Sequence, residues 1–282
     1  MNEKGLVLLS IYFLQPMLSF WGLSTRTIDT TLLQAPLIYL IISLGSIVLS
    51  FIIARLFFTD IKEQSIVTIC VVIGNTGNLG IPLGIALFGE ASIIYTSMIN
   101  VCNIFIVYTL GVFFYSRGNF SFQESLKNIV KLPVIWFASL ALLLNLSGIV
   151  LHPALLKSLE MGAYCTMVIQ LVVFGMYLFN VKLRTMNYKL MLHVNVIKFF
   201  MTPLLTSWIL FGLLDLEPML ATLVFLELIV PLAVTNVNLS ALYDCKALDV
   251  TYLVFMTSLI FIPFFMFVSY CLHYFHIVGN LS

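Results

Sequence analysis

Two stretches of the chain combine proline, glycine and side-chain amides within otherwise apolar sequence. The first, 74–84, reads GNTGNLGIPLG, and the second, 227–238, reads ELIVPLAVTNVN. Amide side chains can donate hydrogen bonds to a carboxylate and accept them from a hydroxyl. A proline inside a helix removes one backbone hydrogen bond and clashes with the preceding turn. The candidate binding residues in the two stretches are Asn75, Thr76, Asn78, Pro82, Pro231, Asn236 and Asn238.

Each interruption would divide a helix into two halves. The N-terminal end of a half-helix exposes free N–H groups and carries partial positive charge, so it attracts anions. We predict that the two interruptions cross near the middle of the membrane and form a small anion site. A lone proline in a membrane helix is more simply a kink, because proline is frequent in such helices. Two proline–amide stretches at matching positions favour a site instead.

Two of the ionisable residues inside the apolar segments, Glu227 and Lys198, need particular attention. Glu227 precedes Pro231 by one helical turn, and an ionised carboxylate in the membrane interior is costly unless it is paired or protonated. Glu227 is therefore a candidate for coupling transport to H⁺ or Na⁺, and a structural acid held by hydrogen bonds is an equally good interpretation. For Lys198 we expect a side chain that extends towards the cytoplasmic interface.

The composition excludes most soluble classes of protein. The chain has 282 residues, of which 61% are hydrophobic and 9% charged, whereas soluble domains carry about 25% charged residues. We therefore predict an all-α polytopic protein whose partner is the lipid bilayer. The sequence lacks a basic tract for nucleic acid and a C-x-x-C pair or similar motif for a disulfide framework, metal or cofactor. It also lacks catalytic motifs such as H-E-x-x-H, so we expect no enzyme; an anion channel is the main alternative to a transporter, and a membrane-embedded enzyme is less well supported.

Nine segments have the length and apolar character of membrane spans. They are 5–24, 33–58, 66–89, 92–115, 129–150, 153–180, 190–214, 218–243 and 248–275. If the spans alternate in direction, ten of the lysines and arginines fall on one side and two, Arg26 and Lys157, on the other. Because positive residues concentrate in cytoplasmic loops, we predict a cytoplasmic (inner or plasma) membrane protein with its N-terminus inside and its C-terminus outside.

The spans also suggest an internal repeat. Pro82 and Pro231 are 149 positions apart, and the same offset places most segments of the first half on segments of the second. Matching segments lie five spans apart and so cross in opposite directions, which is typical of secondary transporters with inverted repeats. We predict a first repeat at 1–115 with four spans and a second at 116–282 with five, forming a single membrane unit.

Several motifs, in order, resemble the auxin efflux carrier family of permeases, which belongs to a superfamily with the bile acid–sodium symporters. The sequence NTGNLGIPL at 75–83 is similar to the signature of the family's fourth helix. The further matches are Pro16 within FLQPML, FGMYL at 174–178, Lys198 with Pro203, Pro231 to Tyr243, and Thr257 and Ser258 with Pro263. The similarity begins at the family's second helix, so the first of its ten helices is not matched. Gln170 stands where the family often has proline.

This resemblance implies a fold of two inverted five-helix repeats with two crossing broken helices. A scaffold and a transport subdomain would be interleaved along the chain and would move against each other. The implied function is secondary transport, by alternating access, of a small organic anion such as a malate- or malonate-like carboxylate or an auxin-like acid. H⁺ or Na⁺ could be the coupling ion, and the resemblance is compatible with a homodimer. It assigns Asn75, Asn78, Pro82, Pro231 and Asn236 to the site.

Overall fold

The computed structural model describes residues 3–25, 33–182, 184 and 186–274, and the regular elements in these ranges are helical. Several helices contain π-helical turns, labelled η. In chain order, the longer elements and their π-turns are α1 (Glu3–Leu9), η1 (Ser10–Leu14), α2 (Gln15–Thr25), α3 (Gln34–Phe57), α4 (Ile61–Cys70), η3 (Thr76–Gly80), α5 (Ile81–Phe88), α6 (Ser92–Ile106), η4 (Val107–Gly111), α7 (Val112–Arg117), α8 (Phe122–Lys131), α9 (Pro133–Leu146), α10 (Pro153–Phe179), α11 (Tyr188–Val196), η6 (Ile197–Met201), α12 (Thr202–Ser207), η7 (Trp208–Leu213), α13 (Pro218–Ile229), α14 (Thr235–Leu242) and α15 (Ala247–Tyr274).

The prediction of an all-α polytopic membrane protein is confirmed. Among the described residues, six helices are long and apolar enough to cross a membrane. The bent pair α8–α9 makes a seventh span if it is counted as one. The third and eighth predicted segments are instead broken, with short apolar helices at Thr76–Phe88 and Pro218–Ile229. The nine predicted segments thus correspond to six continuous helices, one bent pair and two broken segments.

The fifth predicted segment, 129–150, differs from the structure at its start. The helices α8 and α9 meet at an angle of 53°. Between them, Leu132 is extended and Pro133 begins α9. A residue before proline disfavours the helical region of backbone space, so the chain turns there. The span proper begins at Pro133, and α8 is a separate amphipathic helix with a capping box formed by Ser121 and Glu124.

Three prolines inside helices each follow a π-helical turn. The turns η1, η3 and η6 end two residues before Pro16, Pro82 and Pro203, respectively. Proline lacks an N–H and its ring crowds the carbonyl four residues back. The wider π-turn provides the altered hydrogen-bond register that such an insertion needs. These prolines therefore sit within continuous helical segments and do not end them.

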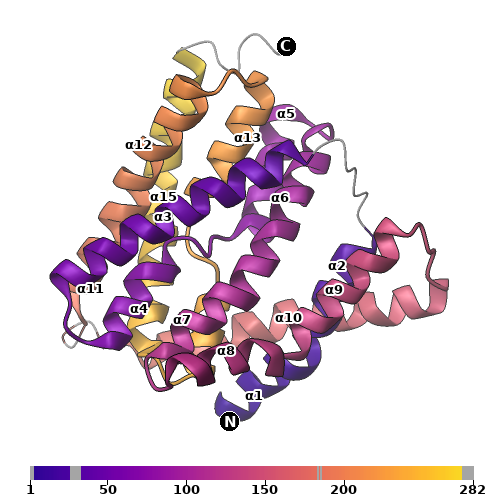
Figure 1. Ribbon diagram of the computed structural model, residues 1–282, viewed down its shortest axis with the longest axis horizontal. Helices are drawn as coiled ribbons and strands as arrows, with labels where there is room; N and C mark the ends of the chain where they lie inside the picture. Colours follow the sequence, from indigo (N-terminus) through magenta and orange to yellow (C-terminus); the bar gives the residue numbers. More distant parts are fainter. Residues whose placement is uncertain (1–2, 26–32, 183, 185, 275–282) are drawn as a thin grey trace.

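The helices form two groups, which we call the panel and the bundle. The panel consists of α1–η1–α2, α9 and α10, which pack on one another at the right of Figure 1 and share a small buried core that includes Phe20, Ala138 and Leu159. The bundle consists of α3–α7 and α11–α15 and holds most of the larger core. Gly162 of α10 allows close packing in the panel, because a methyl group there would lie 2.5 Å from Cε of Met17 in α2.

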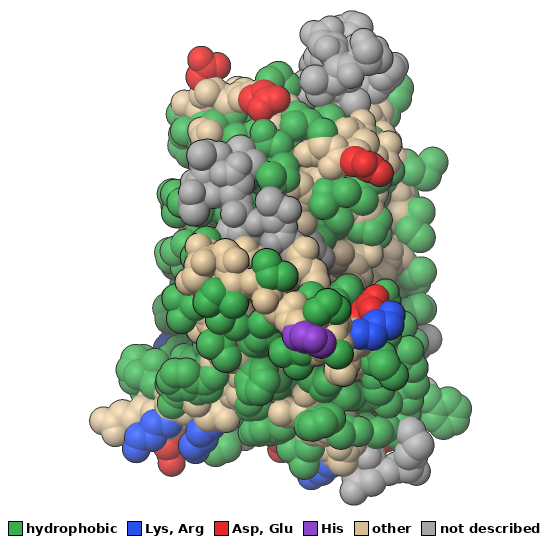
Figure 2. Space-filling model, turned by 90° about the vertical axis from the view of Figure 1, so that its right-hand side faces the viewer, with side chains coloured by type: hydrophobic (Ala, Val, Ile, Leu, Met, Phe, Trp, Pro, Cys, Tyr) green, Lys and Arg blue, Asp and Glu red, His purple; other side chains and the backbone are tan. Residues whose placement is uncertain are grey.

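On the panel side, apolar side chains predominate in the lower half, interrupted by one histidine and one pair of oppositely charged side chains, and lysine and arginine side chains gather at the lower edge (Figure 2). The N-terminus lies at the same lower end of the molecule as this edge (Figures 1 and 2). An apolar band bounded by charged edges is the surface expected of a protein that spans a bilayer.

Candidate functional site

The two broken segments cross as a short antiparallel pair. Between α4 and η3, and again between α13 and α14, the chain is not helical, and an antiparallel bridge joins Gly74 to Leu232. The Asn75 N–H donates to the Pro231 carbonyl at 2.9 Å, and the Ala233 N–H donates to the Ile73 carbonyl at 3.0 Å. Backbone N–H and carbonyl groups that have no helical partner at one break thus form hydrogen bonds with the backbone of the other break. A methyl group at Gly74 would lie 2.9 Å from Val230 Cγ2, so the crossing requires glycine at this position.

The first break lies earlier in the chain than the proline had indicated. The helix α4 ends at Cys70, and helical structure resumes at Thr76. Pro82 is the second residue of α5 and lies seven positions after Asn75, where the break ends. Pro231, in contrast, lies within its break. The run of glycine and asparagine, and not Pro82, therefore makes the first interruption.

Lys198 lies at the crossing, which corrects the expectation that it extends to the interface. Its side chain is 1% exposed. The ammonium donates to the carbonyls of Val71 and Leu228, each at 3.0 Å. These carbonyls belong to the C-terminal ends of α4 and α13, where the helix dipole is negative and the last carbonyls lack intrahelical donors. A single lysine from η6 therefore joins the C-terminal end of α4 to the C-terminal end of α13.

The N-terminal ends of the other half-helices border a cavity of about 140 Å³ between the panel and the bundle. Helix η3 begins at this cavity and α14 begins beside it, so the first N–H groups of both helices are close to the enclosed space. Three of the predicted binding residues line it: Asn75, Thr76 and Asn78. The remaining lining residues of the bundle include Gly74, Gly77, Asn100, Asn103, Tyr108, Ala233 and Thr235.

A hydrogen-bond network holds the first turn of η3 against α6. The Thr76 hydroxyl donates to Asn100 Oδ1 at 2.8 Å and accepts from Asn103 Nδ2 at 2.9 Å. The Asn103 amide also donates to the Gly74 carbonyl at 3.3 Å, and its oxygen accepts from the Tyr39 hydroxyl at 3.2 Å. Asn100 and Asn103 thus both line the cavity and join η3 to α6.

The other predicted binding residues lie beside the cavity lining and not in it. Asn236 is fully buried; its amide donates to the carbonyls of Ile73 and Ala233 at 2.9 and 3.0 Å and its oxygen accepts from the Tyr115 hydroxyl at 2.8 Å. It thus fastens the start of α14 to the opposite break. Asn238 is buried two residues further along α14.

Glu227 is buried on α13, where it faces η3. The residue is 1% exposed. A methyl group placed on Gly80 would lie 2.0 Å from its Oε2 atom and 2.6 Å from Oε1. The carboxyl group therefore lies against the backbone of η3 at Gly80, about one turn after this helix begins at Thr76. A negative group is favoured at that end of a helix.

The panel supplies polar residues to the cavity that the sequence analysis did not assign to the site. Gln15 and Ser19 of α2 and Gln170 of α10 line it, and the Gln170 amide donates to Gln15 Oε1. Their signal in the sequence was an i, i+4 pair of polar residues, Gln15 and Ser19, inside an apolar helix. That signal does not show which neighbour the polar face meets. The cavity thus has one wall from each helix group.

Comparison with known families agrees with this architecture. A family model described as Membrane transport protein matches residues 1–129. This match agrees with the resemblance to the auxin efflux carrier family that the sequence motifs indicate. The matched region includes the first break, with Asn75, Thr76, Asn78 and Pro82, while the second break and Glu227 lie beyond it. Among curated proteins, no significant match to the chain is found.

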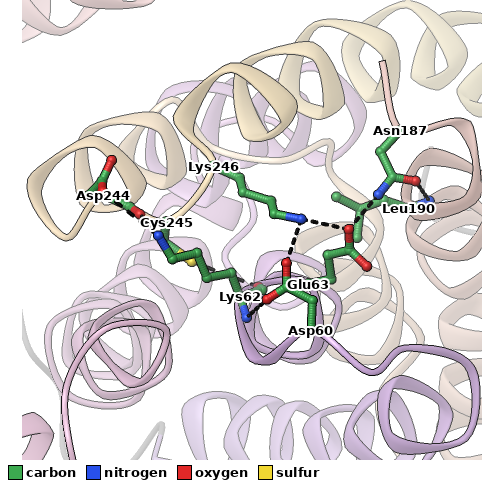
Figure 3. Close-up of polar contacts among 8 residues, drawn as sticks. All are labelled: Asp60, Lys62, Glu63, Asn187, Leu190, Asp244, Cys245 and Lys246. Atoms are coloured by element: carbon green, nitrogen blue, oxygen red, sulfur yellow. Dashed lines mark hydrogen bonds and ion pairs between the residues drawn. The ribbon is translucent and has the colours of Figure 1, made fainter. Parts of the chain in front are cut away.

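The protein also has a charged cluster at the end of the molecule where α4 and α15 begin (Figure 3). Lys246 bridges Asp60 and Glu63, with N–O distances of 2.6 Å to each. The Asn187 amide donates to Glu63 Oε1 at 2.7 Å, and Lys62 Nζ donates to the Asp244 carbonyl at 2.7 Å. The cluster ties the N-terminus of α4 to the turn between α14 and α15, and so joins the outer ends of both crossing segments.

The charges in this cluster stabilise one another. Burial works against ionisation of Asp60, but hydrogen bonds from Lys246 and from the Lys62 backbone outweigh it and lower the pKa of the carboxyl group. Burial likewise works against the charge on Lys246, but its hydrogen bonds to Asp60 and Glu63 raise the pKa of the ammonium. Both groups are therefore charged across the neutral range.

Proposed function

We propose that this membrane transporter is a secondary carrier of a small organic anion. The observation that carries the proposal is the cavity at the N-terminal ends of η3 and α14. Helix N-termini favour negative charge, and amide side chains there can donate to a carboxylate. The Nζ atom of Lys198 lies nearby, since a methyl group on the cavity residue Gly74 would lie 3.5 Å from it, and the protonated side chain would add positive charge. Asn75, Thr76 and Asn78 would contact the anion, while Pro82, Pro231, Asn236 and Asn238 would shape the two helix ends.

The size of the cavity supports a small substrate. Its volume is about 140 Å³, whereas pockets for drug-sized ligands occupy roughly 300 Å³ or more. A malonate- or malate-like carboxylate therefore fits the site better than a larger acid such as an auxin. An anion channel is the alternative, and a flux assay separates it from a carrier.

The two walls of the cavity support alternating access. One wall belongs to the panel and the other to the bundle, so a shift of one group against the other would open the site to either side. A larger hollow of about 690 Å³ lies between the same two groups, where Lys4 and Tyr177 of the panel face Ala241 and Asp249 of the bundle. We assign it as the cytoplasmic vestibule, with the N-terminus inside the cell. The repeats would be 1–115 and 116–282.

Glu227 is our candidate for ion coupling. The Glu227 side chain is buried against η3, the helix that begins at the cavity. Binding of H⁺ or Na⁺ to its carboxyl group would therefore change the position of η3. Glu227→Gln should keep substrate binding but abolish acceleration of flux by a pH or Na⁺ gradient. Unchanged coupling in this variant would remove the role.

The test of the function is carboxylate binding and flux in one set of variants. Thermal stabilisation by malonate, malate and larger carboxylates should identify a ligand, and reconstituted protein should show saturable uptake with counterflow. Asn78→Asp adds negative charge at the cavity and should lower the affinity at least about tenfold, which corresponds to about 1.4 kcal/mol. Gln123→Glu, on the exposed face of α8, makes the same amide-to-carboxylate change away from the cavity and is the matched control, which should bind normally. Unsaturable flux, or equal loss in both variants, would refute the carrier proposal.

A further inference from the structure

A groove lined by phenylalanine runs along the outside of the bundle between α12 and α15. We call it the phenylalanine groove. Its volume is about 460 Å³. The lining residues are Phe199, Phe200, Pro203, Leu204, Ser207, Phe211, Phe225, Phe264, Phe267, Val268, Cys271 and Leu272. Ten of these twelve are apolar by residue type, and the other two are one hydroxyl and one thiol, so the groove offers little to a polar ligand.

The groove lies at the depth of membrane hydrocarbon. Helix α11 begins at Tyr188 and α15 at Ala247, at the end of the molecule that carries the charged cluster. At about 1.5 Å per residue, Phe199 lies roughly 16 Å and Phe211 roughly 34 Å from that end. On α15, Phe264 lies about 25 Å and Leu272 about 37 Å from the same end. Both helices thus place the groove in the half of the membrane away from the charged cluster.

The length of the groove matches one leaflet. Phe199 and Phe211 are 12 positions apart, which corresponds to roughly 18 Å of helix. The hydrocarbon core of a bilayer is about 30 Å thick, or about 15 Å per leaflet. Exposed apolar side chains elsewhere, such as Val48 and Ile52 of α3, form a convex helix face that lipid covers in the ordinary way. The groove differs because it is concave and aromatic on both sides.

We propose that the phenylalanine groove holds one acyl chain of a phospholipid from the leaflet opposite the charged cluster. Phe200 and Phe267 at its rim are 62% and 65% exposed, so the chain can enter from the bilayer. Aromatic pairs form its walls: the ring centroids of Phe199 and Phe264 are 5.1 Å apart, and those of Phe211 and Phe225 are 6.1 Å apart. Burial of apolar surface between the chain and these rings supplies the binding energy as dispersion and packing.

The bound chain would also support the crossing segment α13. Phe225 belongs to α13 and lies two residues before Glu227. A chain in the groove would therefore press on the half-helix whose C-terminal carbonyl accepts from Lys198. This inference goes beyond the anion-carrier function and stands whether or not the carrier transports carboxylates.

Native mass spectrometry of the purified protein, delipidated and then supplied with one phosphatidylglycerol species, tests the proposal. The unsubstituted protein should retain one lipid. Ser207→Phe should fill the groove, and Phe267→Ser should remove part of its wall, and each should lower retention at least fivefold. Met266→Ser is the matched control, since Met266 is adjacent and 69% exposed but outside the lining. Its retention should stay within twofold.

A phospholipid with a photoreactive acyl chain supplies the second measurement, because it reports contact even in a variant with altered stability. Labelling should map to groove residues such as Cys271 and Phe267. Equal lipid loss in Phe267→Ser and Met266→Ser, undiminished retention in Ser207→Phe, or labelling spread evenly over α3 and α15 would overturn the proposal. A lipid-free dimer whose contacts cover the groove would overturn it as well and would assign the face to a second copy of the chain.

Discussion

The two breaks have the same position in the crossing but differ in what they supply. The first, between Cys70 and Thr76, is made by glycine and asparagine and contributes side chains to the cavity. The second, between Ile229 and Thr235, contains Pro231 and contributes mainly backbone, with Ala233 and Thr235 at the lining. From this comparison we predict that side chains of the first break bind the substrate, whereas the second break only positions the two half-helices that meet at the crossing. Substitutions near each break can test this division.

The largest effect is expected from Gly80→Ala. The new methyl group would meet the Glu227 carboxyl group at 2.0 Å, with little room for a buried side chain to move. Overpacking costs typically about 1–3 kcal/mol, and we expect the upper end, measured as a lower thermal unfolding midpoint. Gly175→Ala, which has nothing within 4 Å of the added carbon, is the control and should be neutral. Combining Gly80→Ala with Glu227→Ala should recover much of the loss; no recovery would mean that Glu227 is not the obstacle.

Lys198→Met should rank next, because it acts on both breaks at once. The variant leaves the Val71 and Leu228 carbonyls without their buried donor. Hydrogen bonds to charged groups contribute about 1.5–3 kcal/mol each, and the relief of burying a charge offsets part of this, so we expect a net loss of about 2 kcal/mol. Denaturation in detergent measures it. Lys127→Met, on the exposed face of α8, is the control. Equal stability of the Lys198 and Lys127 variants would contradict a stabilising role for the bonds from Lys198 to the two helix ends.

Tyr115→Phe should affect the second break alone. It removes the hydrogen bond to Asn236 Oδ1 and leaves the two bonds from the Asn236 amide in place. The expected loss is about 1 kcal/mol, which should lower the unfolding midpoint by roughly 2–4 °C. If this break only holds geometry, carboxylate affinity should stay unchanged at a temperature where the variant is folded. A large loss of affinity would show that the second break also carries substrate chemistry.

Lys246→Met should produce the smallest effect. The ion pairs with Asp60 and Glu63 are partly exposed, and such pairs contribute about 1 kcal/mol or less. The lowered pKa of Asp60 means that its contribution is present above the unfolded value of about 3.9 and lost as the pH falls below it. The raised pKa of Lys246 means that its contribution persists until the pH exceeds about 10.4. The difference in unfolding midpoint between the two proteins should therefore stay constant from pH 5 to pH 9 and shrink in acid; a change near pH 7 would point to another group.

Much of the site could be predicted from the sequence because its signals are local. Polar side chains at 75–78 inside an apolar segment had to be buried in protein or face a cavity, since lipid cannot satisfy them, and they line the cavity. Lys198 could not be placed in this way. Whether a lysine reaches the interface or a pair of helix ends depends on neighbours from α4 and α13, which are distant in sequence. The same holds for Gln15 and Gln170, whose partner across the panel is set by packing.

The sequence by itself determined that the chain is an integral membrane protein, where its apolar segments lie, and which two of them are interrupted. These properties follow from composition and hydrophobic length, which are read along a single stretch of chain. Only the tertiary structure decided that the first break falls at Val71–Asn75 and not at Pro82, and that one lysine joins both half-helices. The physical reason is that a broken helix is stable where its freed N–H and carbonyl groups find partners, and here those partners lie on the other broken segment and on η6.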